Sequence, residues 1–102
     1  MLELRVLGSL DLRDSAGAEV RAVLAQPKRL ALLAYLAVHG GGGFHRRDTL
    51  LALFWPESDT ERARGALRRA LYVLRQALGE GVLVSRGDNE VGLGAGLWCD
   101  AA

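Results

Sequence analysis

The stretch at 58–79, SDTERARGALRRALYVLRQALG, limits the folds open to this chain more than any other segment. Ser58 and Glu61 have the spacing of a capping box, and Gly79 is a residue that commonly ends a helix. Between these ends, leucines recur at the spacing of one helix face: Leu67, Leu71, Leu74 and Leu78. We therefore predict a long helix whose leucine face packs into a hydrophobic core.

The same segment is rich in arginine and has no acidic residue after Arg62. On a helical projection, four side chains lie roughly opposite the leucines: Arg62, Arg69, Tyr72 and Gln76. Three further arginines flank the leucine face: Arg64, Arg68 and Arg75. Solvated helix faces usually mix charges of both signs, because acid–base pairs four residues apart stabilise a helix. From this segment alone, a nucleic-acid-binding helix and an ordinary solvated surface both fit the pattern.

The composition indicates one small domain without a strong overall charge. The chain has 102 residues, half of them hydrophobic, with 13 basic and 12 acidic side chains and a net charge of +1. Any attraction for an anionic partner must therefore come from a local cluster of charge. Arginine outnumbers lysine twelve to one, which favours planar, bidentate contacts over point charges.

The sequence also argues against several functional classes. The single cysteine, Cys99, excludes an internal disulfide and a cysteine-built zinc site, and it fits a reducing, cytoplasmic location. His39 and His45 lack the neighbouring carboxylates or cysteines of a metal centre. The longest apolar run, 30–38, is too short to span a bilayer, and the N-terminus lacks the layout of a signal peptide. We therefore expect no metal, no cofactor, no membrane association and no enzymatic activity.

Periodicity and turn residues predict the order of the elements. Three early segments alternate as strands do, the last of them weakly: 2–7, 10–13 and 20–24. Two helices are expected next, joined by a glycine run and a short extended piece at Phe44: 27–39 and 46–55. After the arginine-rich helix, two strands flank a turn at 87–89: 82–85 and 90–93.

This order predicts an α+β fold of the winged helix-turn-helix type. It would have an N-terminal antiparallel sheet, three helices and a C-terminal β-hairpin as the wing. The third helix, at about 59–79, would be the recognition helix. We expect the domain to cover 1–96, and 97–102 to be a tail that leads to a following domain.

Nearly the whole chain resembles the DNA-binding domain of the antibiotic-regulatory (SARP-type) bacterial transcriptional activators, which have an OmpR/PhoB-type winged helix. The resemblance is carried by five stretches: LRVLGSLDL at 4–12, KRLALLAYLA at 28–37, RRDTLLALFWPE at 46–57, RARGALRRALYVLRQALG at 62–79 and VLVSRGDNEVGL at 82–93. It implies promoter binding through the third helix, and a loop at 56–60 that contacts RNA polymerase.

The chain departs from the family pattern at three places. His45 stands where the family often has a serine or threonine that caps the second helix. Asp88 and Glu90 lie beside Arg86 in the wing. Gly65 interrupts the recognition helix, where glycine is unfavourable. Close approach of a DNA backbone and close approach of a neighbouring helix both explain that glycine.

These considerations assign residues to a double-stranded DNA partner. The candidates for reading base edges are Arg69, Tyr72 and Gln76, with Arg62 at the leading end. The candidates for phosphate contact are Arg64, Arg68 and Arg75, with Arg47 at the start of the second helix and Arg86 in the wing. The candidates for polymerase contact are Glu57, Ser58 and Asp59. Two copies on repeated DNA sites are a further expectation. The alternative is a winged-helix protein-interaction module whose arginine-rich helix meets an acidic partner.

Overall fold

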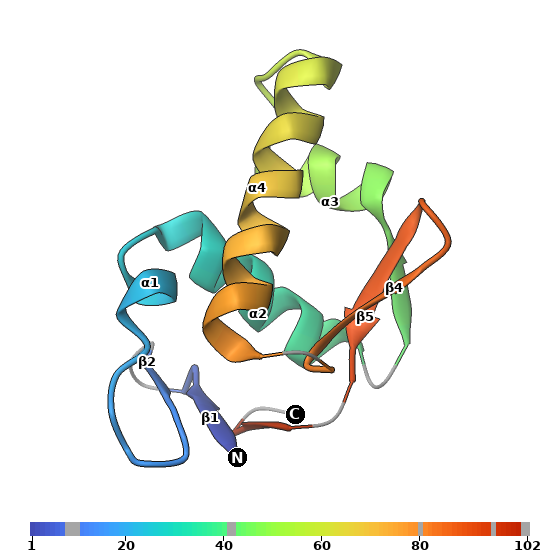
Figure 1. Cartoon of the computed structure of the whole chain (residues 1–102). Coiled ribbons are helices and arrows are strands. Elements are labelled where there is room, and N and C mark those ends of the chain that lie inside the picture. Colours follow the sequence, from blue (N-terminus) through green and yellow to red (C-terminus); the bar gives the residue numbers. More distant parts are fainter. Residues whose placement is uncertain (8–10, 41–42, 80, 95, 101–102) are drawn as a thin grey trace.

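The structure of the chain is a computed structural model that describes residues 1–7, 11–40, 43–79, 81–94 and 96–100 (Figure 1). Its elements follow in this order: β1 (Leu2–Arg5), β2 (Asp11–Arg13), α1 (Arg21–Leu24), α2 (Pro27–Gly40), β3 (Phe44–Arg46), α3 (Arg47–Phe54), α4 (Thr60–Leu78), β4 (Leu83–Arg86), β5 (Glu90–Leu93) and β6 (Leu97–Cys99). Parts of three sequence-based predictions lie outside the described residues: position 10 of the second strand, 41–42 of the glycine run and 101–102 of the tail.

The long helix that the leucine pattern predicts is α4. Its N-cap is Asp59, whose carboxylate Oδ1 accepts a hydrogen bond from the Arg62 backbone N–H at 2.8 Å. The predicted capping box is therefore wrong at its first residue, because the Ser58 N–H lies in the preceding turn and donates to the Trp55 carbonyl at 3.3 Å. Gly79 ends the helix with a positive φ of 91°, a backbone conformation that favours glycine.

The core forms where the leucine face of α4 meets α2, which crosses behind it in Figure 1. The four leucines of this face are between 0% and 8% exposed: Leu67, Leu71, Leu74 and Leu78. They join one continuous apolar cluster with leucines of α2 and with Leu50 of α3. Burying a leucine contributes about 1.5–3 kcal/mol each, so this seam fixes the rotation of α4 about its axis.

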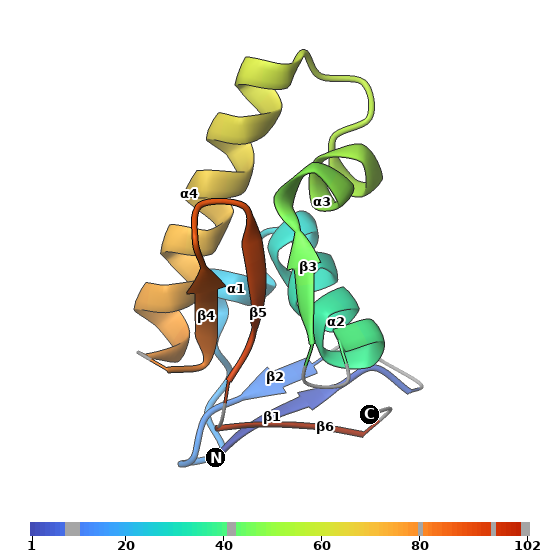
Figure 2. The same ribbon diagram turned by 90° about the vertical axis from the view of Figure 1, so that its right-hand side faces the viewer.

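The N-terminal sheet closes one end of the molecule and contains a strand that the sequence analysis does not predict (Figure 2). Its order is β2-β1-β6, with β1 antiparallel to β2 and parallel to β6. Residues 97–99, expected to begin a tail, form β6. Asp100 then accepts hydrogen bonds from the backbone N–H groups of Val6 and Leu7 at 2.8 and 3.2 Å. This pairing joins residues more than 90 positions apart, which no local pattern indicates.

The predicted third strand at 20–24 is wrong, because this segment forms the short helix α1. The carbonyl of Val20 accepts hydrogen bonds from the N–H groups of Val23 and Leu24 at 3.2 and 3.1 Å. Pairing with β2 stops at the start of the segment, where Glu19 bridges to Arg13 and the Val20 N–H donates to the Leu12 carbonyl at 3.0 Å. The three consecutive apolar residues at 22–24 do not alternate, and the helical turn buries Val23 completely between α2 and α4.

The second sheet places a β-hairpin beside α4, as predicted. Its order is β3-β5-β4, all antiparallel, and the β4–β5 turn contains Gly87 with φ of 62°. β3 runs directly into α3, so this sheet holds the start of α3 next to the hairpin turn (Figure 2). The predicted helices at 27–39 and 46–55 are confirmed as α2 and α3 within one residue. No helix in the described part of the chain combines the length and apolar character needed to cross a bilayer.

The cap assignment gives a direct stability test. We expect Asp59→Ala to lower the free energy of unfolding by about 0.5–2 kcal/mol, because the first turn of α4 loses its side-chain acceptor. Urea denaturation followed by circular dichroism measures the change. Ser58→Ala is the matched control and leaves stability unchanged. A loss with Ser58→Ala and none with Asp59→Ala would restore the original capping box.

Candidate nucleic-acid interface

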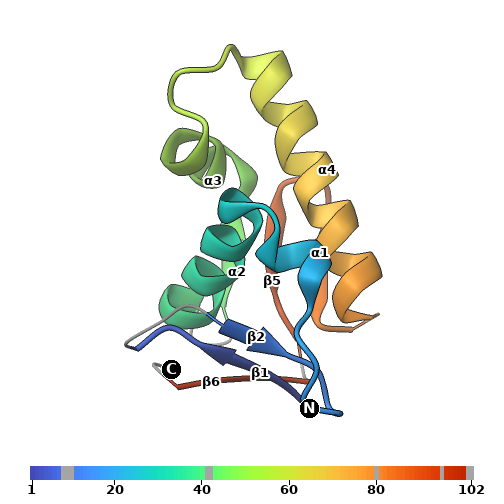
Figure 3. The ribbon, with the colours of Figure 1, turned by 90° about the vertical axis from the view of Figure 1, so that its left-hand side faces the viewer.

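α4 presents a polar face with other elements of the fold on both sides of it. The β4–β5 hairpin and the start of α3 lie on one side of it (Figure 2), and α1 and the start of α2 lie on the other (Figure 3). The exposed side chains of this face include most of the predicted contact residues: Arg62, Arg64, Arg68, Arg69, Tyr72 and Gln76. Tyr72 is 62% exposed, which is unusual for a large aromatic residue. The division of α4 into a leucine face and a polar face is as the sequence predicts.

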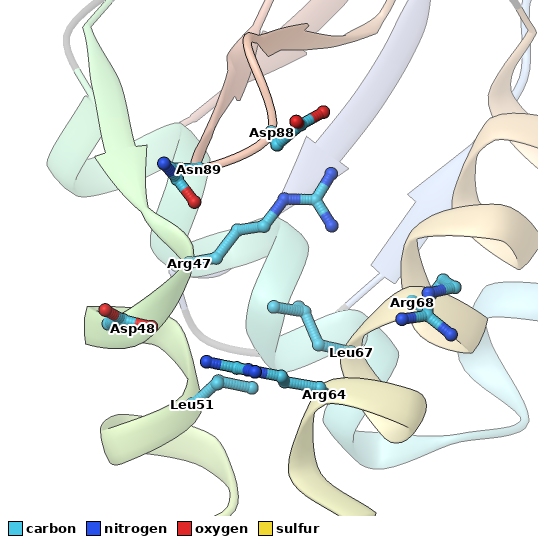
Figure 4. Close-up of a pocket in the computed structure, with 8 residues that line it drawn as sticks. All are labelled: Arg47, Asp48, Leu51, Arg64, Leu67, Arg68, Asp88 and Asn89. Atoms are coloured by element: carbon cyan, nitrogen blue, oxygen red, sulfur yellow. The ribbon is translucent and has the colours of Figure 1, made fainter. Parts of the chain in front are cut away.

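A pocket of about 290 Å³ lies between α3, α4 and the hairpin turn; we call it the hairpin-side pocket (Figure 4). Its lining residues come from all three elements: Arg47, Asp48 and Leu51 from α3, Arg64, Leu67 and Arg68 from α4, and Asp88 and Asn89 from the turn. In Figure 4 the Arg47 side chain extends toward α4, and the Arg64 side chain extends toward α3. The structure thus brings together three arginines that the sequence assigns to phosphate contact.

Arg47 is a partly buried cation in an unfavourable environment. Its backbone N–H donates to the Asn89 carbonyl at 2.7 Å, which ties the start of α3 to the hairpin turn. Its side-chain Nε is buried and has no acceptor among the described residues. Burial, followed by repulsion from Arg75 and Arg68, lowers the pKa of Arg47, and Asp88 only partly offsets this. An anion in the pocket would relieve both the missing acceptor and the repulsion.

The other pocket arginines also lack partners. Among the described residues, neither Arg64 nor Arg68 makes a hydrogen bond or an ion pair. The two acids that line the pocket do not neutralise them: Asp48 lies 4.0 Å from Arg46 in an exposed pair, and Asp88 forms no ion pair with an arginine among the described residues. Exposed arginines that are not used by the fold are available to a partner.

Arg75 belongs to the same side of α4 but has a structural contact as well. Its guanidinium donates a hydrogen bond to the Ser85 hydroxyl and so links α4 to β4. Its charge is also one of those that lower the pKa of Arg47. Arg75 therefore both fixes the hairpin beside α4 and adds to the positive potential of the hairpin-side pocket.

A second cationic surface lies on the opposite side of α4, and the sequence analysis does not identify it. It is a groove of about 160 Å³ between α4 and the start of α2, which we call the α2-side groove. It is lined by Gln26, Lys28, Arg29, Trp55, Ala66, Arg69 and Ala70. The Lys28 ammonium lies 5.3 Å from the centre of the Trp55 ring, a cation–π contact, and Arg29 donates to the Ala22 carbonyl at 3.1 Å. In the sequence, the adjacent basic residues Lys28 and Arg29 at the start of a predicted helix are the feature that could have indicated this groove.

Two other predicted contact residues are engaged within the fold. Arg86 forms two hydrogen bonds of 2.9 Å with the carboxylate of Glu90, and its guanidinium lies 4.4 Å from the centre of the Phe44 ring. The hydrogen bonds from Arg86 lower the pKa of Glu90. Arg86 does not line the hairpin-side pocket. Arg62 lies 3.5 Å from the cap residue Asp59 but is 85% exposed, so that pair is weak.

The loop between α3 and α4 carries the predicted polymerase contacts. Glu57, Ser58 and Asp59 are all exposed. A hollow of about 200 Å³ lies between the end of α3 and the start of α4, and of these three residues only Ser58 lines it. Asp59 has a second role as the cap of α4, so a substitution there changes helix stability as well as surface charge.

No group of three or more His, Cys, Asp or Glu side chains within the described ranges is arranged to hold a metal ion. The His45 ring lies near other rings, with its centre 5.2 Å from that of Tyr35. Its Nε2 is buried and has no hydrogen-bond partner in the described part of the chain. Comparison of the chain with models of known protein families, with curated proteins and with solved structures found no match.

We predict that Arg47 lowers the stability of the free chain and strengthens anion binding in the hairpin-side pocket. We expect Arg47→Met to raise the free energy of unfolding at low ionic strength, because it removes a charge that burial and two arginines disfavour while keeping an apolar stem. Sulfate should raise the melting temperature of the wild-type chain more than that of the variant, because a bound anion stabilises only a chain that holds its site.

Arg21→Met on α1 is the control for the general effect of sulfate on stability. It should respond to sulfate as the wild-type chain does. A variant at Arg47 that is less stable than the wild type, and that responds equally to sulfate, would show that the pocket does not concentrate positive charge.

Proposed function

We propose that this domain is a winged helix that binds double-stranded DNA, with α4 in the major groove and the β4–β5 hairpin as the wing. The observation that carries the proposal is the hairpin-side pocket. Arg64 and Arg68 have no partner among the described residues, and the buried Nε of Arg47 has no acceptor there. Backbone phosphates of DNA supply both the negative charge and the acceptors that this pocket lacks.

The dimensions and charges around α4 favour the major groove. A helix with its side chains is about 10–12 Å across, and the major groove of B-DNA is about 12 Å wide. On α4, Tyr72 and Gln76 are exposed between the two cationic surfaces. In this orientation the hairpin-side pocket and the α2-side groove meet the phosphates of opposite groove walls, and the residues between them reach base edges.

The resemblance to SARP-type activators supports a more specific role. In that role the domain binds promoter DNA sequence-specifically as part of a bacterial transcriptional activator, in the cytoplasm. The loop at 56–60 then contacts RNA polymerase. Its exposed carboxylates, Glu57 and Asp59, repel phosphates, which favours a protein partner for this loop over DNA.

The other functional class is a protein-interaction module. In that case the arginines of α4 bind an acidic protein surface instead of phosphates. Binding to duplex DNA that falls steeply as salt rises distinguishes the two, because phosphate contacts release condensed counterions from DNA.

DNA binding should depend on the arginines of the hairpin-side pocket. We expect the logarithm of the wild-type affinity for mixed-sequence duplex DNA to fall linearly with the logarithm of salt concentration. Arg64→Ala and Arg68→Ala should each weaken binding by a similar factor on every sequence and reduce the salt slope by about one, because each removes a phosphate contact. Fluorescence anisotropy at several salt concentrations gives both quantities.

Two further variants calibrate this experiment. Arg5→Ala lies in β1, in the N-terminal sheet that closes one end of the molecule, and should leave affinity and slope unchanged. Glu90→Gln removes the partner of Arg86 and should raise affinity, because the hairpin gains an unpaired cation. Wild-type affinity that is flat with salt, or absent at low salt, would contradict the proposal. Preference for an acidic polypeptide over DNA would favour the protein-interaction module.

The second prediction separates DNA binding from activation. We expect Glu57→Ala combined with Ser58→Ala to leave DNA affinity unchanged or slightly higher, while lowering transcription from a promoter that the protein occupies. Asp59 stays intact because it caps α4. Gel-shift and in vitro transcription assays on one promoter measure the two effects. A large loss of DNA binding in a folded double variant would place this loop on DNA instead.

A further inference from the structure

Gly65 lies in the second turn of α4, where neither the backbone nor the packing requires glycine. It is absent from the residues with positive φ, so an L-residue fits its backbone conformation. Apart from the neighbouring residues and backbone of α4 itself, a Cβ built at this position meets no described heavy atom within 4 Å. Glycine inside a helix is unfavourable relative to alanine, because it loses more conformational freedom on folding. Of the two explanations that the sequence leaves open, the described structure thus removes close approach of a neighbouring helix.

The glycine forms the floor of a hollow on the exposed face of α4. Besides Gly65, the hollow is lined by Arg68, Arg69 and Tyr72. These residues follow the glycine by three, four and seven positions along the helix. These spacings place the side chains on one face around the missing Cβ. The lining of the hollow is mainly apolar, as expected for the Tyr72 ring and the methylene stems of two arginines. The shape and chemistry suit an apolar group carried on an anionic polymer.

We propose that this hollow receives the 5-methyl edge of a thymine, and that Gly65 makes the domain specific for thymine at one base pair. The inference rests on the proposed function. The thymine methyl is the apolar group that base edges present in the major groove. Recognition helices contact base edges with their N-terminal residues, and Gly65 is the sixth residue of α4.

A backbone phosphate fits this position less well. Gly65 lies opposite the buried leucine face, so it points to the groove floor when α4 enters the groove, while phosphates line the walls. The amide of Gly65 is inside the helix and is not free to bind a phosphate. In this orientation the phosphates along both walls of the DNA groove already have cationic partners. These come from the hairpin-side pocket on one side and from the α2-side groove on the other.

The test removes one methyl group from the DNA and, separately, adds one to the protein at Gly65. A high-affinity duplex is first selected from a random pool with the wild-type chain, and each thymine in it is replaced singly by uracil, which lacks the 5-methyl group. At one position, uracil should lower wild-type affinity about fourfold, the effect expected from exposing one buried methyl group. Gly65→Ala should bind the thymine duplex several-fold more weakly and recover affinity on the uracil duplex, where its own methyl takes the vacated space.

Two controls separate this effect from misfolding and from general weakening. Gly65→Ala should raise the melting temperature of the free protein, so that weaker binding cannot come from a damaged fold. Gln76→Ala, further along the same face, should weaken binding without changing the thymine-to-uracil ratio.

The outcomes distinguish the inference from the function on which it rests. If the wild-type chain binds duplex DNA but no uracil substitution weakens it, or if Gly65→Ala keeps the wild-type preference for thymine, the inference is overturned and the proposed function stands. If the wild-type chain binds no duplex at all, both fall.

Discussion

Burial of the leucine face of α4 is the interaction on which the rest of the structure depends. Leu74 is fully buried and Leu71 nearly so, and both belong to the cluster that α2, α3 and the two sheets share. A helix held along this seam cannot rotate without exposing leucines to water. The rotation in turn fixes the opposite face, so the same packing that stabilises the fold determines which side chains a partner can reach. The position of the hairpin follows too, because Arg75 links α4 to Ser85 of β4.

The charges of the domain are arranged unevenly around this helix. At the hairpin, Glu90 holds Arg86 in a bidentate pair, and the N-terminal sheet pairs its arginines with nearby acids such as Asp11. The hairpin-side pocket is different, because burial and like charge both disfavour the ionised form of Arg47. A fold that pairs these arginines with acids but keeps the repulsion at Arg47 loses some stability at the pocket. Such a loss is common at binding sites, where a partner supplies the missing interaction.

The sequence predicts the elements whose pattern is local and strong. The leucine repeat predicts α4, prolines mark the limits of the neighbouring helices, and the Gly87 turn predicts the hairpin. Predictions fail where the deciding contact is distant. β6 exists because it pairs with β1 across nearly the whole chain, and α1 replaces a strand because Val23 is buried between two helices. The site follows the same rule: the arginines of α4 are visible from their periodicity, whereas the α2-side groove depends on how α2 meets α4.

We propose that the exposed face of α4, with the hairpin turn beside it, is the surface that contacts DNA. The most direct measurement is a titration of the ¹⁵N-labelled chain with a short duplex, followed by amide chemical shifts. We expect large, salt-sensitive shifts at Gly65, Arg68, Arg47 and Asn89, with small shifts throughout β1, β2 and β6. Shifts confined to the N-terminal sheet, or spectra that do not change as duplex is added at low salt, would contradict it.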